Sequence, residues 1–230
     1  MLLYEGKAKK IFEAENGRVT LFFKDDATAG NRAKEAQFKG KGQLNCEISA
    51  ILFEMMRNAG IKTHYISKKD ERTHLCHKLN IIPIEVIVRN IAAGTFCKRY
   101  GLDVGQTLDN VIVEWCVKDD DLNDPPICDD AITALGMATI DTLNHLRDQA
   151  LKINDVLTQL FKSLDLKLVD FKLEFGYHAN GTILLGDEIC PDTMRLWNKN
   201  NESFDKDLFR LDSGDLLAGY KEVLNKLEGK

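Results

Sequence analysis

The sequence predicts an α+β fold in two lobes: a small N-terminal lobe with an antiparallel β-sheet and one helix, and a larger C-terminal α/β lobe. Three observations predict it. Short apolar and polar pieces alternate over residues 2–24, an amphipathic helical pattern follows, and a strictly alternating strand comes after a long helical pattern near residue 170. We place the division at residues 1–82 and 83–230, because Pro83 interrupts an apolar run.

The N-terminal residues show the pattern of tight hairpins. Gly6 and the Asn16-Gly17 pair separate the short pieces, and Asn-Gly favours a two-residue turn. A helix is predicted between Asn45 and Gly60, since apolar residues recur there at helical spacing and Gly60 occupies the place of a C-terminal cap. Two further strands are predicted, over residues 61–66 and 73–79.

The C-terminal lobe begins with a mostly apolar run over residues 81–89, which predicts a buried strand. An acidic segment that ends in two prolines, residues 118–126, predicts a loop. A long helical region is predicted after Asp129, because apolar residues recur on one face as far as Leu164. This helix leads directly into the alternating strand.

Composition restricts the classes of function. The chain has 230 residues, 44% hydrophobic and 29% charged, with a formal charge of -5, so no basic field indicates a nucleic-acid partner. Neither a signal-like apolar segment nor a run of about 20 apolar residues occurs, so we expect no membrane and a cytoplasmic location. The six cysteines form no CxxC pair, and we expect reduced thiols.

The alternating strand carries the densest chemistry in the chain. Between Val169 and Phe175, the polar side chains Asp170, Lys172 and Glu174 share one face, and the apolar ones share the other. If Asn180-Gly181 forms a two-residue turn, the register of the following strand places Glu174 opposite Asp187.

Two opposed carboxylates repel each other unless a positive charge lies between them. A magnesium ion resolves that conflict, because Mg²⁺ favours a few carboxylates completed by water and phosphate oxygens. A solvated polar face of a sheet is the alternative. The continuation over residues 186–197 favours chemistry, because it adds three more carboxylates and Arg195. Lys172 on the same face would neutralise a transferred phosphoryl group.

Six segments together resemble the SAICAR synthetase family of de novo purine biosynthesis. They are YEGKAKKIF at 4–12, IPIEVIVRNIAAGT at 82–95, KRYG at 98–101, DFKLEFG at 170–176, GDEICPDTMRLW at 186–197 and DKDLFR at 205–210. The acidic loop at 118–125 also matches. The resemblance therefore extends over nearly the whole chain.

The resemblance implies an ATP-dependent ligase that condenses carboxyaminoimidazole ribonucleotide (CAIR) with L-aspartate to give SAICAR, ADP and phosphate, through an acyl phosphate. Magnesium is the implied cofactor, and small molecules are the implied partners. ATP would lie in the cleft between the lobes, in an outline like that of a kinase. The family's habit implies a homodimer.

The resemblance also implies roles for individual residues. The proposed ATP contacts are Gly6, Lys7, Lys9, Lys10, Glu85 and Lys118. The pocket for the 5′-phosphate of CAIR would use Arg89, Thr95, Lys98, Arg99, Arg195 and Arg210, where Thr95 replaces the family's usual serine. Asp124 would bind the exocyclic amine, and Glu174 and Asp187 would bind the metal. Asp170 and Asp192 are candidate general bases beside Lys172. The L-aspartate site stays open.

Other functions fit less of the sequence. Asp170-Phe171-Lys172 fits the DxK element of some nucleases, but Pro191-Asp192 follows it where a nuclease has the Pro-Asp first. A regulator that binds ATP without turnover would not need so many acids and bases. The loop after Lys118 lacks the glycine and glutamate of a calcium loop. His74 and His77 are three apart on a predicted strand and would face opposite ways.

Overall fold

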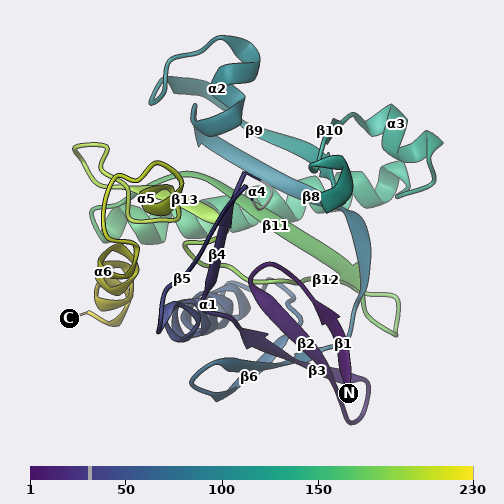
Figure 1. Ribbon diagram of the computed structural model, residues 1–230. Helices are drawn as coiled ribbons and strands as arrows, with labels where there is room; N and C mark the ends of the chain where they lie inside the picture. Colours follow the sequence, from purple (N-terminus) through teal and green to yellow (C-terminus); the bar gives the residue numbers. More distant parts are fainter. Residues whose placement is uncertain (31–32, 230) are drawn as a thin grey trace.

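The computed structural model describes residues 1–30 and 33–229, and it confirms an α+β fold in two lobes. Within these residues the N-terminal lobe is built on a five-stranded antiparallel sheet with the order β1-β2-β3-β7-β6 (Figure 1). Its strands are β1 (Leu2–Glu5), β2 (Lys9–Ala14), β3 (Arg18–Phe23), β6 (Tyr65–Asp70) and β7 (Thr73–His77). The predicted hairpins are confirmed: Asn16 and Gly17 both have positive φ angles, 60° and 67°, between β2 and β3.

Helix α1 (Lys41–Asn58) packs on this sheet through Ile48, Leu52 and Phe53. It begins four residues before the predicted start, and Gly60 follows its end with a φ of 76°, as a glycine cap requires. The strand predicted over 61–66 is wrong over its first four residues, because β6 begins only at Tyr65. The hairpin of β4 (Asp26–Ala29) and β5 (Lys34–Gln37) was not predicted.

The C-terminal sheet has the order β10-β9-β8-β11-β12, and β13 also pairs with β11. Its strands are β8 (Asn80–Ile91), β9 (Thr107–Val117), β10 (Pro126–Ile127), β11 (Lys167–Tyr177), β12 (Ile183–Leu185) and β13 (Met194–Trp197). The buried strand predicted at 81–89 is β8. Pro83 lies inside it, opposite an irregularity between Glu174 and Gly176 where the partner strand does not need a proline N–H. The boundary at 82/83 stays a prediction.

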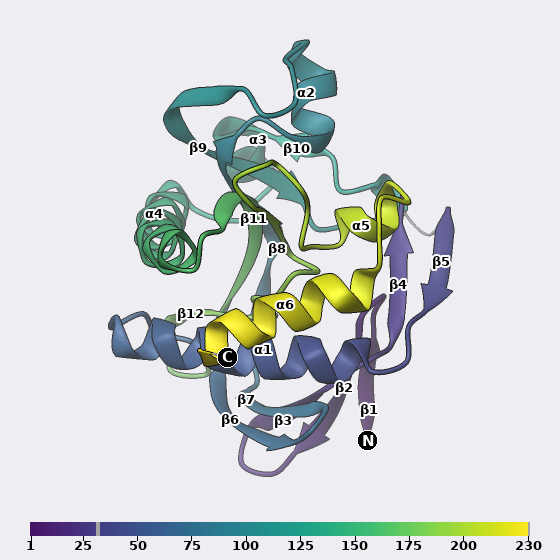
Figure 2. The ribbon, with the colours of Figure 1, turned by 90° about the vertical axis from the view of Figure 1, so that its left-hand side faces the viewer.

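The helices of the C-terminal part are α2 (Gly94–Tyr100), the short 3₁₀ turn η1 (Asp120–Leu122), α3 (Asp129–Ala134), α4 (Ile140–Ser163), α5 (Asp207–Arg210) and α6 (Leu216–Glu228). The predicted long helix is α4, which covers the sheet with the buried face of Leu143, Ala150 and Leu157. Helix α6 returns to lie beside α1 (Figure 2). One continuous apolar core therefore joins α1, α4, β8, β11 and Val223 of α6.

The predicted register of the β11–β12 hairpin is wrong by one residue. Phe175 pairs with Leu185 and Tyr177 with Ile183, because residues 179–181 form a three-residue loop with Gly181 at a φ of 81°. Glu174 therefore faces Gly186, whose N–H donates to the Glu174 carbonyl oxygen at 2.8 Å. Asp187 lies beyond the end of β12, at a φ of 56°.

All six cysteines are free thiols, five of them buried and only Cys128 exposed. No helix among the described residues is both long and apolar enough to cross a membrane. His74 is fully buried and its Nε2 contacts the carbonyl oxygen of Cys46 at 2.8 Å, whereas His77 lies half-buried beside His178. The two histidines thus occupy separate environments on β7.

Candidate active site

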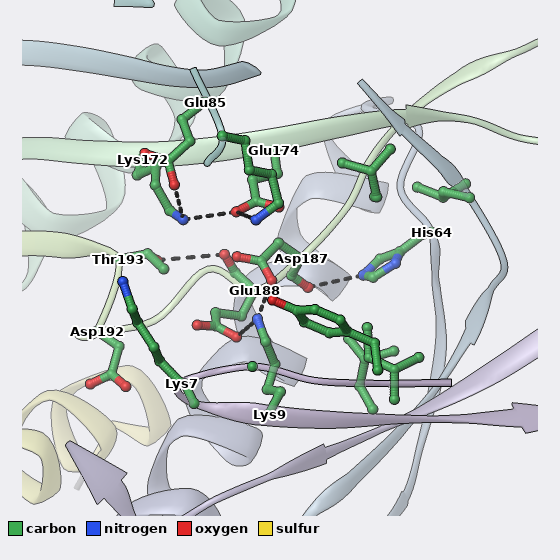
Figure 3. A pocket seen from close by; sticks show the side chains of 18 of the residues that line it. Lys7, Lys9, His64, Glu85, Lys172, Glu174, Asp187, Glu188, Asp192 and Thr193 are labelled. Atoms are coloured by element: carbon green, nitrogen blue, oxygen red, sulfur yellow. Dashed lines mark hydrogen bonds and ion pairs between the residues drawn. The ribbon is translucent and has the colours of Figure 1, made fainter. Parts of the chain in front are cut away.

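A cavity of about 650 Å³ lies between the two lobes. The Gly6 turn and the faces of β2 and β3 form one wall, and β8, β11 and the segment from Asp187 to Thr193 form the other (Figure 3). Most of the predicted ATP, metal and catalytic residues line it: Gly6, Lys7, Lys9, Glu85, Lys118, Lys172, Glu174, Asp187 and Asp192. Asp124, predicted to bind the substrate, lines it too. Apolar side chains from both lobes complete the lining: Ile11, Val19, Leu21, Leu79 and Ile81.

Two glutamates face each other directly across the central strands of the C-terminal sheet. Glu85 on β8 pairs in register with Glu174 on β11, and both are almost fully buried. Lys172 resolves the repulsion, because its Nζ lies 2.7 Å from Oε1 of Glu85 and 2.8 Å from Oε1 of Glu174. Lys118 reaches the same Glu174 oxygen at 2.9 Å. The acid that opposes Glu174 is thus Glu85, not Asp187 as the predicted register implied.

These contacts also set the protonation of the cluster. Burial raises the pKa of Glu85, although Lys172 opposes that shift. Burial works against a charge on Lys172 too, but Glu174, Glu85 and Asp187 raise its pKa well above the usual range. Lys172 is therefore a fixed cation at neutral pH, held between two carboxylates on the cavity wall.

The second acidic pair, Asp187 and Glu188, comes from the segment after β12. Lys9 of β2 forms ion pairs with both carboxylates and so joins the two lobes across the cavity. Burial opposes the charge on Asp187, but Lys9 and Lys172 hold its pKa well below the usual range. Burial and the neighbouring Asp187 raise the pKa of Glu188 to about 6.

His64 supports this segment from the N-terminal lobe. Its Nε2 lies 3.0 Å from the carbonyl oxygen of Asp187, and its own backbone N–H donates to the Leu185 carbonyl oxygen at 2.8 Å. Burial lowers the pKa of His64 to about 3, so the ring is neutral and its Nε2–H donates to Asp187. His64 thus steadies the left-handed backbone turn that directs the Asp187 carboxylate into the cavity (Figure 3).

The oxygen donors of Glu174 and Asp187 fit a magnesium ion. Both carboxylates lie close enough to influence the charge on Lys172. Within the part of the chain that the structure describes, no group of three or more His, Cys, Asp or Glu side chains is arranged around a metal position. Glu174 and Asp187 would supply two hard oxygen ligands rather than a complete cage, and Mg²⁺ commonly takes its remaining ligands from water and substrate phosphates.

A chain of alternating charges outside the cavity lining crosses the C-terminal sheet from α2 to α5. Asp170 accepts from Nη1 of Arg89 at 2.8 Å and from Nη1 of Arg195 at 2.8 Å. The chain continues in both directions through two further acids, Glu114 and Asp207. The remaining pairs are Arg89–Glu114 at 2.6 Å, Arg99–Glu114 at 3.1 Å, Arg195–Asp207 at 2.7 Å and Arg210–Asp207 at 2.6 Å. Four arginines share three acids, so the chain carries a net positive charge.

The start of α2 lies against this chain of charges. Gly94 has a φ of 59°, and a Cβ atom there would lie 2.5 Å from Nη2 of Arg195. The predicted residues Thr95 and Lys98 follow on the same helix, and both are exposed. The structure thus brings Arg89, Arg195 and the α2 turn together, outside the lining of the main cavity.

The two candidate bases, Asp170 and Asp192, are both held by other side chains. Asp192 accepts from the hydroxyl of Tyr220 at 2.5 Å and pairs with the fully buried Lys41. Burial opposes the charge on Asp192, but Lys41 lowers its pKa below the usual range. Asp192 therefore ties the cavity wall to α1 and α6.

Two other predicted residues, Lys10 and Asp124, differ in their position relative to the cavity. Lys10 lies on the face of β2 opposite to Lys9, pairs with Glu5 at 3.3 Å and does not line the cavity. Its predicted contact with ATP stays a prediction. Asp124 does line the cavity, at a φ of 47°, and its Oδ1 accepts from the N–H of Asp119 at 3.0 Å.

The structure adds residues that were not predicted as part of the site: Lys41, His64, Gly94, Glu114, Glu188, Lys206 and Asp207. Glu188 and Lys206 lie within motifs already noted, so their neighbours in sequence could have indicated them. Lys41 and His64 had no such signal. Each reaches the site only through a contact with a residue distant in sequence: Asp192 lies 151 residues after Lys41, and Asp187 lies 123 residues after His64.

Comparison with known proteins identifies close relatives over the whole chain. The family model described as SAICAR synthetase matches residues 2–227. A phosphoribosylaminoimidazole-succinocarboxamide synthase of Finegoldia magna is 51% identical over 229 residues, 99% of each chain. The crystal structure of the synthase of that name from Ehrlichia chaffeensis superposes with a TM-score of 0.97 at 43% identity, over 99% of this chain and 98% of that one. A SAICAR synthetase (Type-2) in complex with ADP superposes with a TM-score of 0.96 at 44% identity, over 99% and 97%.

Proposed function

The chain belongs to the SAICAR synthetase family, and from this premise we propose how its cavity carries out the family's reaction. It is an ATP-dependent ligase of de novo purine biosynthesis that condenses CAIR with L-aspartate to give SAICAR, ADP and phosphate. The observation that carries the assignment to this cavity is the concentration of lysines and carboxylates between the two lobes. Four lysines there are paired with acids of the cavity: Lys7, Lys9, Lys118 and Lys172.

ATP would enter between the Gly6 turn and the C-terminal sheet. The adenine would pack against the apolar lining that includes Val19 and Ile81, with Glu85 and Lys118 close to its base and ribose. The phosphates would lie near Lys7 and Lys9, where the absence of a side chain on Gly6 allows close approach. A glycine turn beside lysines supplies both space and positive charge.

Glu174 and Asp187 would hold Mg²⁺, which when bound supplies positive charge against the phosphate oxygens. Lys172 already lies between Glu174 and Glu85, and it would stabilise the charge on the transferred phosphoryl group. His64 and Lys9 would keep Asp187 in position. These groups are fixed before substrate binds, which is what electrostatic stabilisation of phosphoryl transfer requires.

CAIR would bind with its 5′-phosphate at the chain of arginines around Asp170. Arg89 and Arg195 would be the principal contacts, with Thr95, Lys98, Arg99 and Arg210 around them, because guanidinium groups match phosphate geometry. The excess of arginine over acid there supports the proposal. Asp124 would meet the exocyclic amine, since it lines the cavity on the side of Glu85 and Lys118.

The carboxylate of CAIR would be activated as an acyl phosphate. A carboxylate resists attack by an amine because its leaving group would be an oxide; transfer of the γ-phosphoryl group of ATP supplies phosphate as the leaving group instead. The amino group of L-aspartate then attacks the acyl carbon, and phosphate departs. Asp170 and Asp192 stay candidates for the base, although their arginine and lysine contacts support a positioning role for both.

A cytoplasmic location and a homodimer are further proposals. Six free thiols support a reducing compartment. The proposal of a homodimer is based only on the resemblance to the family. Gel filtration with light scattering measures the molar mass directly, and a single chain of 26.0 kDa would contradict the dimer.

The reaction is tested by a coupled assay for ADP release with purified protein, ATP and CAIR. One arm omits L-aspartate and another omits magnesium. We expect product only in the complete mixture, with SAICAR identified by mass spectrometry. ADP release that does not depend on L-aspartate, without SAICAR, would contradict the proposed function.

A further inference from the structure

Two of the lysines that line the cavity lack a counter-charge among the described residues, and one of the two is partly shielded from solvent. Of the lysines that line the cavity, only Lys78 and Lys206 have neither a hydrogen bond nor an ion pair through Nζ within the described residues. Lys78 is exposed, so water solvates its charge, whereas Lys206 is half-buried. Burying an ammonium group without a partner is costly.

The surroundings of Lys206 do not supply the missing charge. Burial lowers the pKa of Lys206, and the carboxylate that opposes this shift most is that of Asp192. That carboxylate is already engaged by Lys41 and by the hydroxyl of Tyr220. The backbone fixes the position, because the N–H of Lys206 donates to the carbonyl oxygen of Pro191 at 3.2 Å. This end of the cavity is therefore short of one negative charge.

Lys206 also lies where the two proposed binding regions meet. The next residue, Asp207, holds Arg195 at 2.7 Å and Arg210 at 2.6 Å, beside the proposed phosphate pocket. Glu188, whose carboxylate pairs with Lys9 near the proposed ATP phosphates, lines the same cavity as Lys206. A group bound at Lys206 would thus lie between ATP and CAIR, where the acyl phosphate must be attacked.

We propose that Lys206 binds a carboxylate of the amino-acid substrate, L-aspartate. The inference rests on the proposed function, in which ATP and CAIR have their own cationic contacts and the two carboxylates of L-aspartate have none. A charge-assisted hydrogen bond to Lys206 would supply the missing negative charge. It would also hold the amino group beside the activated carbonyl carbon, which favours attack by positioning.

The test compares Lys206→Met, which removes the charge at similar length, with Lys206→Arg, which keeps it. Lys221→Met is the matched control, because Lys221 is exposed on α6 away from the cavity. Initial rates give kcat and KM for L-aspartate, ATP and CAIR separately. Loss of a charged hydrogen bond should raise KM for L-aspartate in Lys206→Met by about tenfold to a hundredfold. KM for ATP and for CAIR should change less than about twofold, and Lys206→Arg should recover part of the loss.

Two outcomes overturn the inference while leaving the reaction intact. In the first, wild-type protein makes SAICAR but Lys206→Met keeps the wild-type KM for L-aspartate. In the second, KM for ATP or CAIR rises as much as KM for L-aspartate, which indicates a phosphate contact or a distorted cavity. If Lys206→Met fails to fold by circular dichroism, Lys206→Gln takes its place in the same comparison. Wild-type protein that makes no aspartate-dependent product would instead overturn the proposed function itself.

Discussion

Arg89 and Asp170 face each other in register across β8 and β11, and Nη1 of Arg89 donates to Oδ2 of Asp170 at 2.8 Å. Both side chains are buried, at 3% and 4% relative exposure. The same carboxylate also accepts from Arg195, so one acid orients the two arginines that would bind the phosphate of CAIR. A single residue thus connects the stability of the sheet to the geometry of the proposed pocket.

Asp170→Asn should therefore reduce both stability and binding. The substitution leaves the buried Arg89 and the half-buried Arg195 without their shared counter-charge, and breaking a buried pair costs about 3 to 5 kcal/mol. We expect the free energy of unfolding in urea to fall by about that amount, and KM for CAIR to rise more than KM for ATP. Asp155→Asn, at an exposed position on α4, is the control. Equal stability of the two variants would show that Asp170 does not hold the arginines.

Glu174→Gln and Asp187→Asn should each reduce kcat by at least about a hundredfold, because each removes one of the two carboxylates proposed to hold magnesium. The circular dichroism spectrum should stay that of the folded protein. Glu71→Gln, in the exposed turn between β6 and β7, should keep wild-type kinetics. Near-normal activity in either cavity variant would argue against the shared metal site.

Gly94→Ala and Gly101→Ala form a matched pair at the two ends of α2. Both glycines have positive φ, 59° and 66°, so both substitutions should cost about 1 to 2 kcal/mol of stability. Only at Gly94 would the new Cβ meet Arg195, at 2.5 Å from Nη2, whereas nothing lies within 4 Å at Gly101. Steady-state kinetics should show KM for CAIR raised several-fold in Gly94→Ala alone. If KM for CAIR changed equally in both variants, the contact with Arg195 would not be the cause, and Arg195 would have no role in binding the phosphate of CAIR.

His64 should make the protein less stable in mild acid. Its folded pKa of about 3 is below the unfolded value of about 6.5, so stability is complete above pH 6.5 and falls as protons bind the unfolded chain at lower pH. Between pH 7 and pH 5 this residue alone should account for a loss of about 2 kcal/mol. Urea unfolding of His64→Gln should show a loss smaller by about that amount.

Exposed His145→Gln should match the wild-type pH profile and serves as the control. A His64→Gln profile parallel to that of the wild type would mean that folding does not lower the pKa of His64. It would contradict the neutral, buried ring that donates to Asp187 throughout this pH range.

Local patterns in the sequence were sufficient to predict most of the helices and strands. Strict alternation in β11 placed Asp170, Lys172 and Glu174 on one face, and the structure bears this out through their shared contacts with β8. Helical spacing likewise identified α1 and α4. Such patterns indicate which face of an element is buried. Their spacing indicates its type, because apolar residues recur every second residue in a half-buried strand and every three to four residues in a helix.

The register of the β11–β12 hairpin could not be predicted in the same way. A glycine with positive φ serves both a two-residue turn and a three-residue loop, and the structure uses the loop at residues 179–181. The one-residue shift places Gly186 instead of Asp187 opposite Glu174, and the acid that faces Glu174 is Glu85 on the neighbouring strand β8. Asp187 nevertheless reaches the cavity, because the backbone turns at that residue and His64 holds the turn from the other lobe.

The remaining features of the site could not be predicted because they depend on contacts between segments that are distant in the sequence. Nothing local indicates that Lys41, in the first turn of α1, is buried against Asp192, or that Lys206 is a half-buried cavity lysine whose Nζ has no hydrogen bond or ion pair within the described residues. The resemblance supplied the substrates and many residue roles. The distribution of charge among those residues becomes clear only when both lobes are assembled.

The central claim is that this cavity activates the carboxylate of CAIR by phosphoryl transfer before L-aspartate attacks. The most direct test uses CAIR labelled with ¹⁸O in that carboxylate and follows the phosphate released during turnover by mass spectrometry. An acyl phosphate predicts that one labelled oxygen passes from each CAIR carboxylate into phosphate as SAICAR forms. SAICAR formed together with unlabelled phosphate would contradict the account.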